Sequence, residues 1–152
     1  MAGRLAGIAR HGRSRGPIQV IDRVHVSVEA GLAGDFRGAV KPGGKGKRQV
    51  SLMEADDWSA AMADLRADLD WSVRRANLLV EGFDLPQTAG AVVAIGEDVR
   101  LEITVECDPC SRMEEIAAGL KAALTPDWRG GALARVLRGG DIAVGDEIGI
   151  EE

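Results

Sequence analysis

Two cysteines separated by two residues, in the segment Cys107-Asp108-Pro109-Cys110, are the most reactive-looking feature of this 152-residue chain. Such a pair has three interpretations: half of a zinc site, a redox dithiol, or one functional thiol with a bystander. Zinc takes about four ligands, and the chain offers no second cysteine pair and only His11 and His25, in distant segments. A thioredoxin-like motif needs a regular alternation of strands and helices that the sequence lacks. The first two interpretations therefore have little support.

The third interpretation has a physical basis at Cys110. Ser111 and Glu114 have capping-box spacing, so Ser111 is the predicted N-cap of a helix and Cys110 directly precedes it. The sulfur would lie near the positive end of that helix, with Arg112 close by, and both favour the thiolate that attacks electrophiles and binds metal. The alternative is packing as a small hydrophobe, which we favour for Cys107 at the end of a strand.

A second group of polar residues is Arg74-Arg75-Ala76-Asn77. Two adjacent arginines cannot share one face of a strand, so one is expected to point inward to a polar partner. An arginine presents a planar fork to phosphate or carboxylate, and the asparagine amide both donates and accepts hydrogen bonds. Salt bridges with the preceding acidic helix explain the pair equally well.

The charge of the chain is unevenly distributed. The net charge is −5, but residues 1–50 hold ten Lys or Arg against three acids, a balance of +7, and the remainder has a balance of −12. A local site for a small anion fits this pattern better than a nucleic-acid surface, because the acidic remainder would repel a duplex. Aromatic residues, at 3%, are too few for base stacking on single strands. Arg10, Arg13 and Arg15 are interpreted as solvated loop charges.

The sequence gives no sign of export or of a membrane span. No apolar run approaches the roughly 20 residues that a span requires, and the arginine-containing first 21 residues lack the apolar core of a signal peptide. With only two cysteines, we expect a cytoplasmic, reducing location.

Hydrophobic periodicity predicts about seven short strands and two helices in one domain spanning residues 1–152. The strands are expected within the eight apolar segments 5–9, 18–28, 49–52, 78–80, 92–95, 99–105, 132–137 and 142–150. The clearest unit is the hairpin of 92–95 and 99–105 around Gly96-Glu97-Asp98. The segment 132–150 is expected to form a closing strand-turn-strand unit, and 35–47 an exposed basic loop.

The two expected helices have the 3.6-residue period of a packed face. One follows Ser51 and Glu54, which have capping-box spacing, and buries Trp58, Met62, Leu65 and Leu69. The other runs from Ser111 to near Pro126. Strands adjacent in sequence predict a mainly antiparallel β-barrel with the helices packed outside it.

Several short motifs, in order along the chain, together resemble the MOSC domain family, named after the C-terminal domain of molybdenum cofactor sulfurase. They are Gly31-Leu-Ala-Gly-Asp35, Arg48-Gln-Val-Ser-Leu52, Arg75-Ala-Asn77-Leu-Leu-Val-Glu-Gly82 with Leu85, Asp108-Pro-Cys110, Gly131 with Arg135-Val136, and Gly140 through Gly145-Asp146. The resemblance implies a mainly β barrel, which agrees with the element count.

The resemblance also implies a molybdenum cofactor and the residues that would hold it. Cys110 matches the family's thiolate ligand of molybdenum and is the expected catalytic residue. Arg75 and Asn77 match the Arg-x-Asn motif that contacts the pterin in the amidoxime-reducing members, with Ala76 where those members have proline. The basic residues expected to bind the rest of the cofactor, including its phosphate, are Lys45, Lys47, Arg48, Arg112 and Arg135.

The implied reaction is the two-electron reduction of a small N-hydroxylated substrate, with electrons from a separate donor protein. The alternative is sulfur relay, in which Cys110 takes a persulfide from a pyridoxal-phosphate-dependent cysteine desulfurase; no pyridoxal-phosphate site is assignable in the chain itself. A third possibility is a cofactor carrier without turnover. Larger reductase members have an additional N-terminal domain that helps to enclose the cofactor. Here we expect that a homodimer or another protein completes the site, or that the cofactor is held only loosely.

Overall fold

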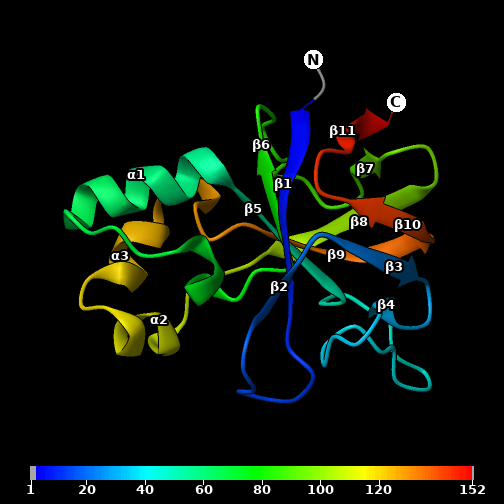
Figure 1. The fold of residues 1–152 in the computed structure, drawn as a ribbon, viewed down its shortest axis with the longest axis horizontal. Helices are drawn as coiled ribbons and strands as arrows, with labels where there is room; N and C mark the ends of the chain where they lie inside the picture. The colour runs from blue at the N-terminus through cyan, green and yellow to red at the C-terminus, as the bar shows by residue number, and fades with distance from the viewer. Residues whose placement is uncertain (1–2, 152) are drawn as a thin grey trace.

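The computed structural model describes residues 3–151, which form a mainly β structure with helices along one side (Figure 1). The strands are β1 (Gly3–Arg10), β2 (Gln19–Ile21), β3 (Arg23–Ser27), β4 (Gly31–Leu32), β5 (Val50–Glu54), β6 (Leu78–Glu81), β7 (Val92–Ile95), β8 (Val99–Glu106), β9 (Ala132–Arg138), β10 (Gly140–Ala143) and β11 (Glu147–Glu151). The α-helices are α1 (Ala55–Leu65), α2 (Ser111–Ile116) and α3 (Leu120–Leu124), with 3-10 helices η1 (Trp71–Arg74) and η2 (Pro126–Trp128).

Seven strands close into a barrel. Their order is β11-β7-β8-β9-β5-β6-β1, and β1 pairs again with β11 to complete the ring. Neighbours are antiparallel except β5 and β6, which are parallel and lie on either side of α1 in the chain. The strand β2 extends the sheet beyond β1, while β10, β3 and β4 form a second sheet. The predicted mainly β barrel with packed helices is confirmed.

Two apolar layers lie on opposite sides of the same strands. Leu52 on β5 and Leu78 on β6 are buried inside the barrel, whereas their neighbours Met53 and Leu79 are buried against the helices. Successive side chains of a strand point to opposite faces, so these two strands supply both layers. The helices therefore cover one outer wall of the barrel, as the left side of Figure 1 shows.

The hairpin of β7 and β8 is confirmed, with Ile95 opposite Val99 and Val92 opposite Glu102. The predicted 18–28 strand is divided into β2 and β3, and 142–150 is divided by a turn at Gly145. The prediction that residues 132–150 form a closing strand-turn-strand unit is wrong in its pairing, because β10 pairs with β3, and β11 pairs with β7 and β1.

Both predicted helices are shorter than their apolar periodicity indicated. The N-cap of α1 is Glu54 rather than Ser51, and the helix ends at Leu65, where Arg66 adopts a left-handed conformation. Leu69 still packs in this layer, and its carbonyl accepts a 3.0 Å hydrogen bond from the Trp58 indole. The second helix is split into α2 and α3: the C-cap of α2 is Ala117, whose backbone is extended, and Gly119, at φ +86°, is the N-cap of α3. Within residues 3–151, no helix is long and apolar enough to cross a bilayer.

Candidate functional site

A cavity of about 320 Å³ opens where several segments meet at one end of the barrel wall. Its lining comes from the chain after β1, the turn after β4, the start of β5, the η1–β6 junction, and the β8–α2 connection. The connection contains both cysteines, and the η1–β6 junction contains the Arg74–Asn77 segment. Two motifs singled out from the sequence therefore border one cavity.

Positive charge dominates this cavity. Six arginines line it against two aspartates, Asp35 and Asp108; the arginines are Arg15, Arg37, Arg48, Arg74, Arg75 and Arg112. Burial, and then the charges of Arg112 and Arg37, lower the pKa of Arg75. Cations this closely grouped favour an anion among them.

Cys110 is exposed at the mouth of this cavity and is itself the N-cap of α2, in place of the predicted Ser111. Its carbonyl accepts a hydrogen bond from the Met113 amide at 2.9 Å. The thiol is thus held at the start of α2 where a ligand in the cavity can reach it. In the part of the chain that the structure describes, no group of three or more His, Cys, Asp or Glu side chains is placed to hold a metal ion.

Cys107 lies in more polar surroundings than the sequence predicted. It is half-buried, borders the same cavity, and its Sγ accepts a hydrogen bond from Arg74 Nη2 at 3.3 Å. Its amide donates to the Gly131 carbonyl at 2.9 Å. Gly131 has φ +100°, and a Cβ there would meet the Leu52 carbonyl oxygen at 2.0 Å, so only glycine fits beside β5.

Arg74 is the inward-pointing member of the arginine pair, as the sequence predicted. The residue is 7% exposed, and Nη2 donates to the carbonyls of Cys107 at 3.0 Å and Gly130 at 2.9 Å. Its partners are therefore main-chain oxygens of the loops around the cysteines, and not the acidic helix. Its Nε is buried without a hydrogen-bond partner.

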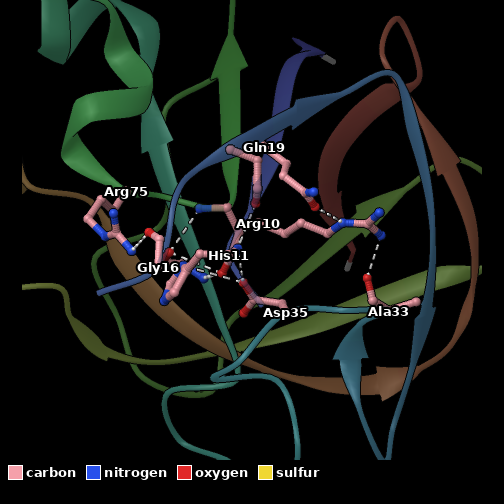
Figure 2. Close-up of polar contacts among 10 residues, drawn as sticks. Arg10, His11, Gly16, Gln19, Ala33, Asp35 and Arg75 are labelled. Atoms are coloured by element: carbon pink, nitrogen blue, oxygen red, sulfur yellow. Dashed lines mark hydrogen bonds and ion pairs between the residues drawn. The ribbon is translucent and has the colours of Figure 1, made fainter. Parts of the chain in front are cut away.

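Arg75 and Asn77, the two residues expected to contact a pterin, both line the cavity but make different contacts. Arg75 donates to the Gly16 carbonyl at 2.7 Å and so holds the loop after β1 (Figure 2). The Asn77 side chain is buried and joins three strands: Oδ1 accepts from the Ser51 amide at 3.0 Å, and Nδ2 donates to the Ala9 carbonyl at 3.1 Å. Asn77 thus fixes the wall of the cavity.

The other predicted basic residues divide into two groups. Arg48 and Arg112 line the cavity, whereas Lys45, Lys47 and Arg135 are not part of its lining. Lys45 and Lys47 are exposed on the 35–47 loop. Arg135 is turned to Glu102, 2.7 Å away, and donates to the Lys45 carbonyl. The structure brings Cys110, Arg75, Asn77, Arg48 and Arg112 together and leaves these three outside.

Sequence reasoning missed four residues of the lining. Arg15 was interpreted as a solvated loop charge, and Arg37 was part of a loop with no assigned role; both line the cavity. His11 and Asp35 lie there together, with the His11 amide donating to Asp35 Oδ1 at 3.1 Å. The only sequence signal was the motif that ends at Asp35, because the burial of His11 arises from tertiary packing.

The surroundings of His11 favour its neutral imidazole. Burial is the main cause that lowers its pKa; the Asp35 carboxylate opposes this, and the charges of Arg75, Arg37 and Arg112 reinforce it. His11 Nδ1 is 3.7 Å from Asp35 Oδ1 and makes no hydrogen bond there. The two side chains are therefore neighbours without a hydrogen bond between their polar atoms.

Known structures share this fold at low sequence identity. The YuaD protein of Bacillus subtilis superposes with a TM-score of 0.76 at 17% identity, covering 97% of this chain and 94% of its own. YiiM of Escherichia coli gives 0.70 at 13% identity over 98% and 70% of the two chains. YiiM of Geobacillus stearothermophilus gives 0.73 at 14% identity over 99% and 75%.

A comparison with curated protein sequences found no significant match. The model of the MOSC domain, in contrast, matches residues 11–149, which include every cavity segment described above. The chain belongs to the MOSC domain family.

Proposed function

We propose that the cavity binds a molybdenum cofactor with Cys110 as the protein ligand of the metal, and that the chain reduces small N-hydroxylated substrates. The observation that carries the proposal is the placement of an exposed thiol beside six arginines in one cavity. The MOSC family is associated with this cofactor, and Cys110 is the residue that matches the family's cysteine.

The residues of the cavity fit such a group. A thiolate is a soft ligand for a metal centre, and guanidinium forks match the phosphate and the polar ring edges of the cofactor. His11 Nδ1 and Arg74 Nε are buried without hydrogen-bond partners in residues that border the cavity. An anionic ligand with several acceptors would offset the positive charge of the arginines that line the cavity.

Each chain residue has a defined part in this proposal. Cys110 would hold the metal, while Arg37, Arg48 and Arg112 would hold the anionic part of the cofactor. Arg75 would also bind the anionic part of the cofactor while it keeps its hydrogen bond to the Gly16 carbonyl. Ligand binding would therefore also order the loop after β1. When bound, the cofactor supplies a metal centre that exchanges two electrons. A separate electron-donor protein is part of the proposal, because each turnover consumes two electrons.

Sulfur relay is the second candidate, and one observation favours it. Cys110 is exposed, so the active-site cysteine of a desulfurase could reach it and leave a persulfide. In that case the same arginines would bind the acceptor of the sulfur atom.

Turnover separates these functions. Protein from a host that makes the cofactor is mixed with an amidoxime and a reduced viologen dye, and amidine formation is measured for the wild type, Cys110→Ser and the control Cys107→Ser. We expect amidine from the wild type and the control and none from Cys110→Ser. Molybdenum-loaded protein without turnover would contradict the reductase and leave a carrier. A Cys110 persulfide seen by mass spectrometry after incubation with a desulfurase and cysteine, in protein without molybdenum, would favour relay.

A further inference from the structure

His11 is a buried polar side chain at the cavity that neither of the proposed roles uses. Its side chain is 9% exposed, and that of Asp35 beside it is 1% exposed. The main chain holds the residue on both sides: its amide donates to Asp35 Oδ1, and its carbonyl accepts from the Phe36 amide at 2.7 Å. Figure 2 shows His11 between Asp35 and the contact of Arg75 with Gly16.

The ring is placed to exchange a proton with a ligand. Nδ1 lies on the Asp35 side, 3.7 Å from Oδ1, and has no hydrogen-bond partner. A small rotation of the ring would bring Nδ1–H onto the carboxylate, and this contact would fix the tautomer and leave Nε2 as the nitrogen that a ligand can reach. His11 lines the cavity, and with Nδ1 turned to Asp35 only Nε2 would remain to meet the contents of the cavity.

The charges that act on the ring come from three segments. Asp35 and Arg37 lie in the turn after β4, Arg75 follows η1, and Arg112 is on α2. Arg15, in the same loop after β1 as His11, lines the same cavity. Phe36 adds a ring whose centroid is 6.3 Å from that of His11. The cations outnumber the single carboxylate, so they oppose a positive charge on His11.

An anion bound among these arginines would offset their charge and favour the imidazolium. A unit charge several ångströms away in a partly solvated site shifts a titration by roughly one pH unit. Anion binding and proton uptake by His11 are then linked, and each favours the other.

We propose that His11, held by Asp35, is the proton donor of the cavity and carries its proton only when an anionic ligand occupies the neighbouring arginines. The role rests on the proposed reduction. There the N–O bond of the substrate breaks, two electrons arrive from the electron-donor protein, and two protons are taken up to give the reduced nitrogen base and water. His11 Nε2 supplies one of these protons to the departing oxygen, and solvent supplies the other.

The first test follows the titration of His11 itself and needs no molybdenum. It is feasible because the chain has only two histidines. His25 is exposed and contacts Asp141 away from the cavity, so a His25→Gln protein leaves a single imidazole to follow by proton NMR. Its titration is measured with inorganic phosphate and with chloride at matched ionic strength. We expect a midpoint below 6.5 in chloride and an increase of about one unit in phosphate. In this background, Arg112→Gln should reduce the increase, whereas Arg23→Gln, on β3, should preserve it. An equal midpoint in the two salts would overturn the proposal.

The second test separates a proton donor from a structural residue. In molybdenum-loaded protein, His11→Gln is expected to retain the metal but to lose roughly a hundredfold or more in kcat. Its pH profile should also lack the decline at high pH that the loss of the His11 proton causes in the wild type. Full turnover in this variant would overturn the donor role. A wild type that binds no molybdenum but retains the phosphate-linked shift would overturn the proposed function and leave the linkage standing.

Discussion

Arg74 and Arg75 are adjacent in sequence but make different contacts. Arg74 is buried and holds the two loops that flank Cys107 through the carbonyls of Cys107 and Gly130. Gly130 makes this possible, because a Cβ there would lie 2.6 Å from the Cys107 carbonyl oxygen and 3.2 Å from the guanidinium. Arg75 is half-buried and makes one contact to the loop after β1. Arg74 therefore has a structural role, whereas Arg75 is the member of the pair that we propose contacts a ligand.

Replacing Arg74 should destabilise the fold more than replacing Arg75. Arg74→Met leaves two carbonyls without their donor, and we expect a loss of about 2–4 kcal/mol in the free energy of unfolding. Thermal unfolding followed by circular dichroism should show Tm lower by roughly 4–12 °C. Arg75→Ala loses one exchangeable contact and should cost about 1 kcal/mol or less. Equal Tm values for the two variants would contradict this division.

The sequence predicted these residues to different extents. That one of the arginines points inward followed from the geometry of adjacent side chains, but its main-chain partners come from segments 33 and 56 residues away. Cys110 was found from its position before a helix. His11 was not found, because nothing local marks a histidine after a strand as buried.

At the scale of elements, Asn77 is the connection between β1, β5 and β6. Its side chain bonds to Ser51 on β5 and to Ala9 on β1, while its own amide donates to Ser51 Oγ at 3.0 Å. These strands form the wall against which the cavity arginines are placed.

Asn77→Ala should destabilise the barrel as well as alter the cavity. The substitution removes the side-chain partner of the part-buried Ser51 amide and of the buried Ala9 carbonyl, at a cost of about 2–3 kcal/mol. We expect denaturant unfolding to shift to a lower midpoint with an unchanged m value. Asn77→Asp, which keeps the acceptor for Ser51, is the matched comparison. An Ala variant as stable as the wild type would contradict this structural role of Asn77.

Glu54, at the start of α1, predicts a specific dependence of stability on pH. Burial, aided by the charges of Asp57, Asp84 and Asp56, raises its pKa from 4.5 to about 7, against the hydrogen bond from the Leu85 amide. The native state therefore binds this proton more tightly than the unfolded chain does. The resulting stability is complete below about pH 4.5 and is lost as the pH rises through about 7.

Glu54→Gln should remove this loss of stability at high pH, because the glutamine side chain does not titrate. Its amide oxygen can still accept the hydrogen bond from the Leu85 amide. We expect the variant to be more stable than the wild type at pH 8 by about 1 kcal/mol, a value discounted because the side chain is partly solvated. The advantage should be smaller at pH 5. Chemical denaturation at the two pH values measures it, and a constant difference between the proteins would contradict the prediction.

Elements were predicted best where the pattern was local. The β7–β8 hairpin follows from strict alternation around a glycine turn, which requires no distant contact. The lengths of the helices could not be read from periodicity, because Leu69 and Leu120 pack in the helical layer whether or not the helix is continuous. The pairing of β10 with β3 joins segments more than 110 residues apart, and no local signal specifies it.

At the scale of the molecule, the charge asymmetry has a structural explanation. A chain of net charge −5 gathers six arginines at one cavity, and three of them, Arg15, Arg37 and Arg48, come from its basic first third. The arginines that line the cavity agree with the local excess of positive charge in the sequence, and anion binding there stays a prediction. The sequence could not place the site, because the other arginines arrive from the η1–β6 junction and α2.

Anions should accordingly stabilise the folded protein. Millimolar phosphate is expected to raise Tm relative to chloride at equal ionic strength. When phosphate is at 100 times its Kd, the free energy of unfolding should increase by about 2.7 kcal/mol. Differential scanning fluorimetry on the wild type, Arg112→Gln and Arg23→Gln makes the comparison. A phosphate effect that is the same in all three proteins would contradict specific binding in the cavity.

The metal content of the purified protein is the sharpest test of the proposal that this cavity holds a molybdenum cofactor through Cys110. Wild type, Cys110→Ala and Cys107→Ala are purified from a host that makes the cofactor, and molybdenum per chain is measured by inductively coupled plasma mass spectrometry. We predict near-stoichiometric molybdenum in the wild type and in Cys107→Ala, and its loss in Cys110→Ala. Absence of molybdenum from all three proteins, while a known molybdoenzyme from the same host is loaded, would contradict the account.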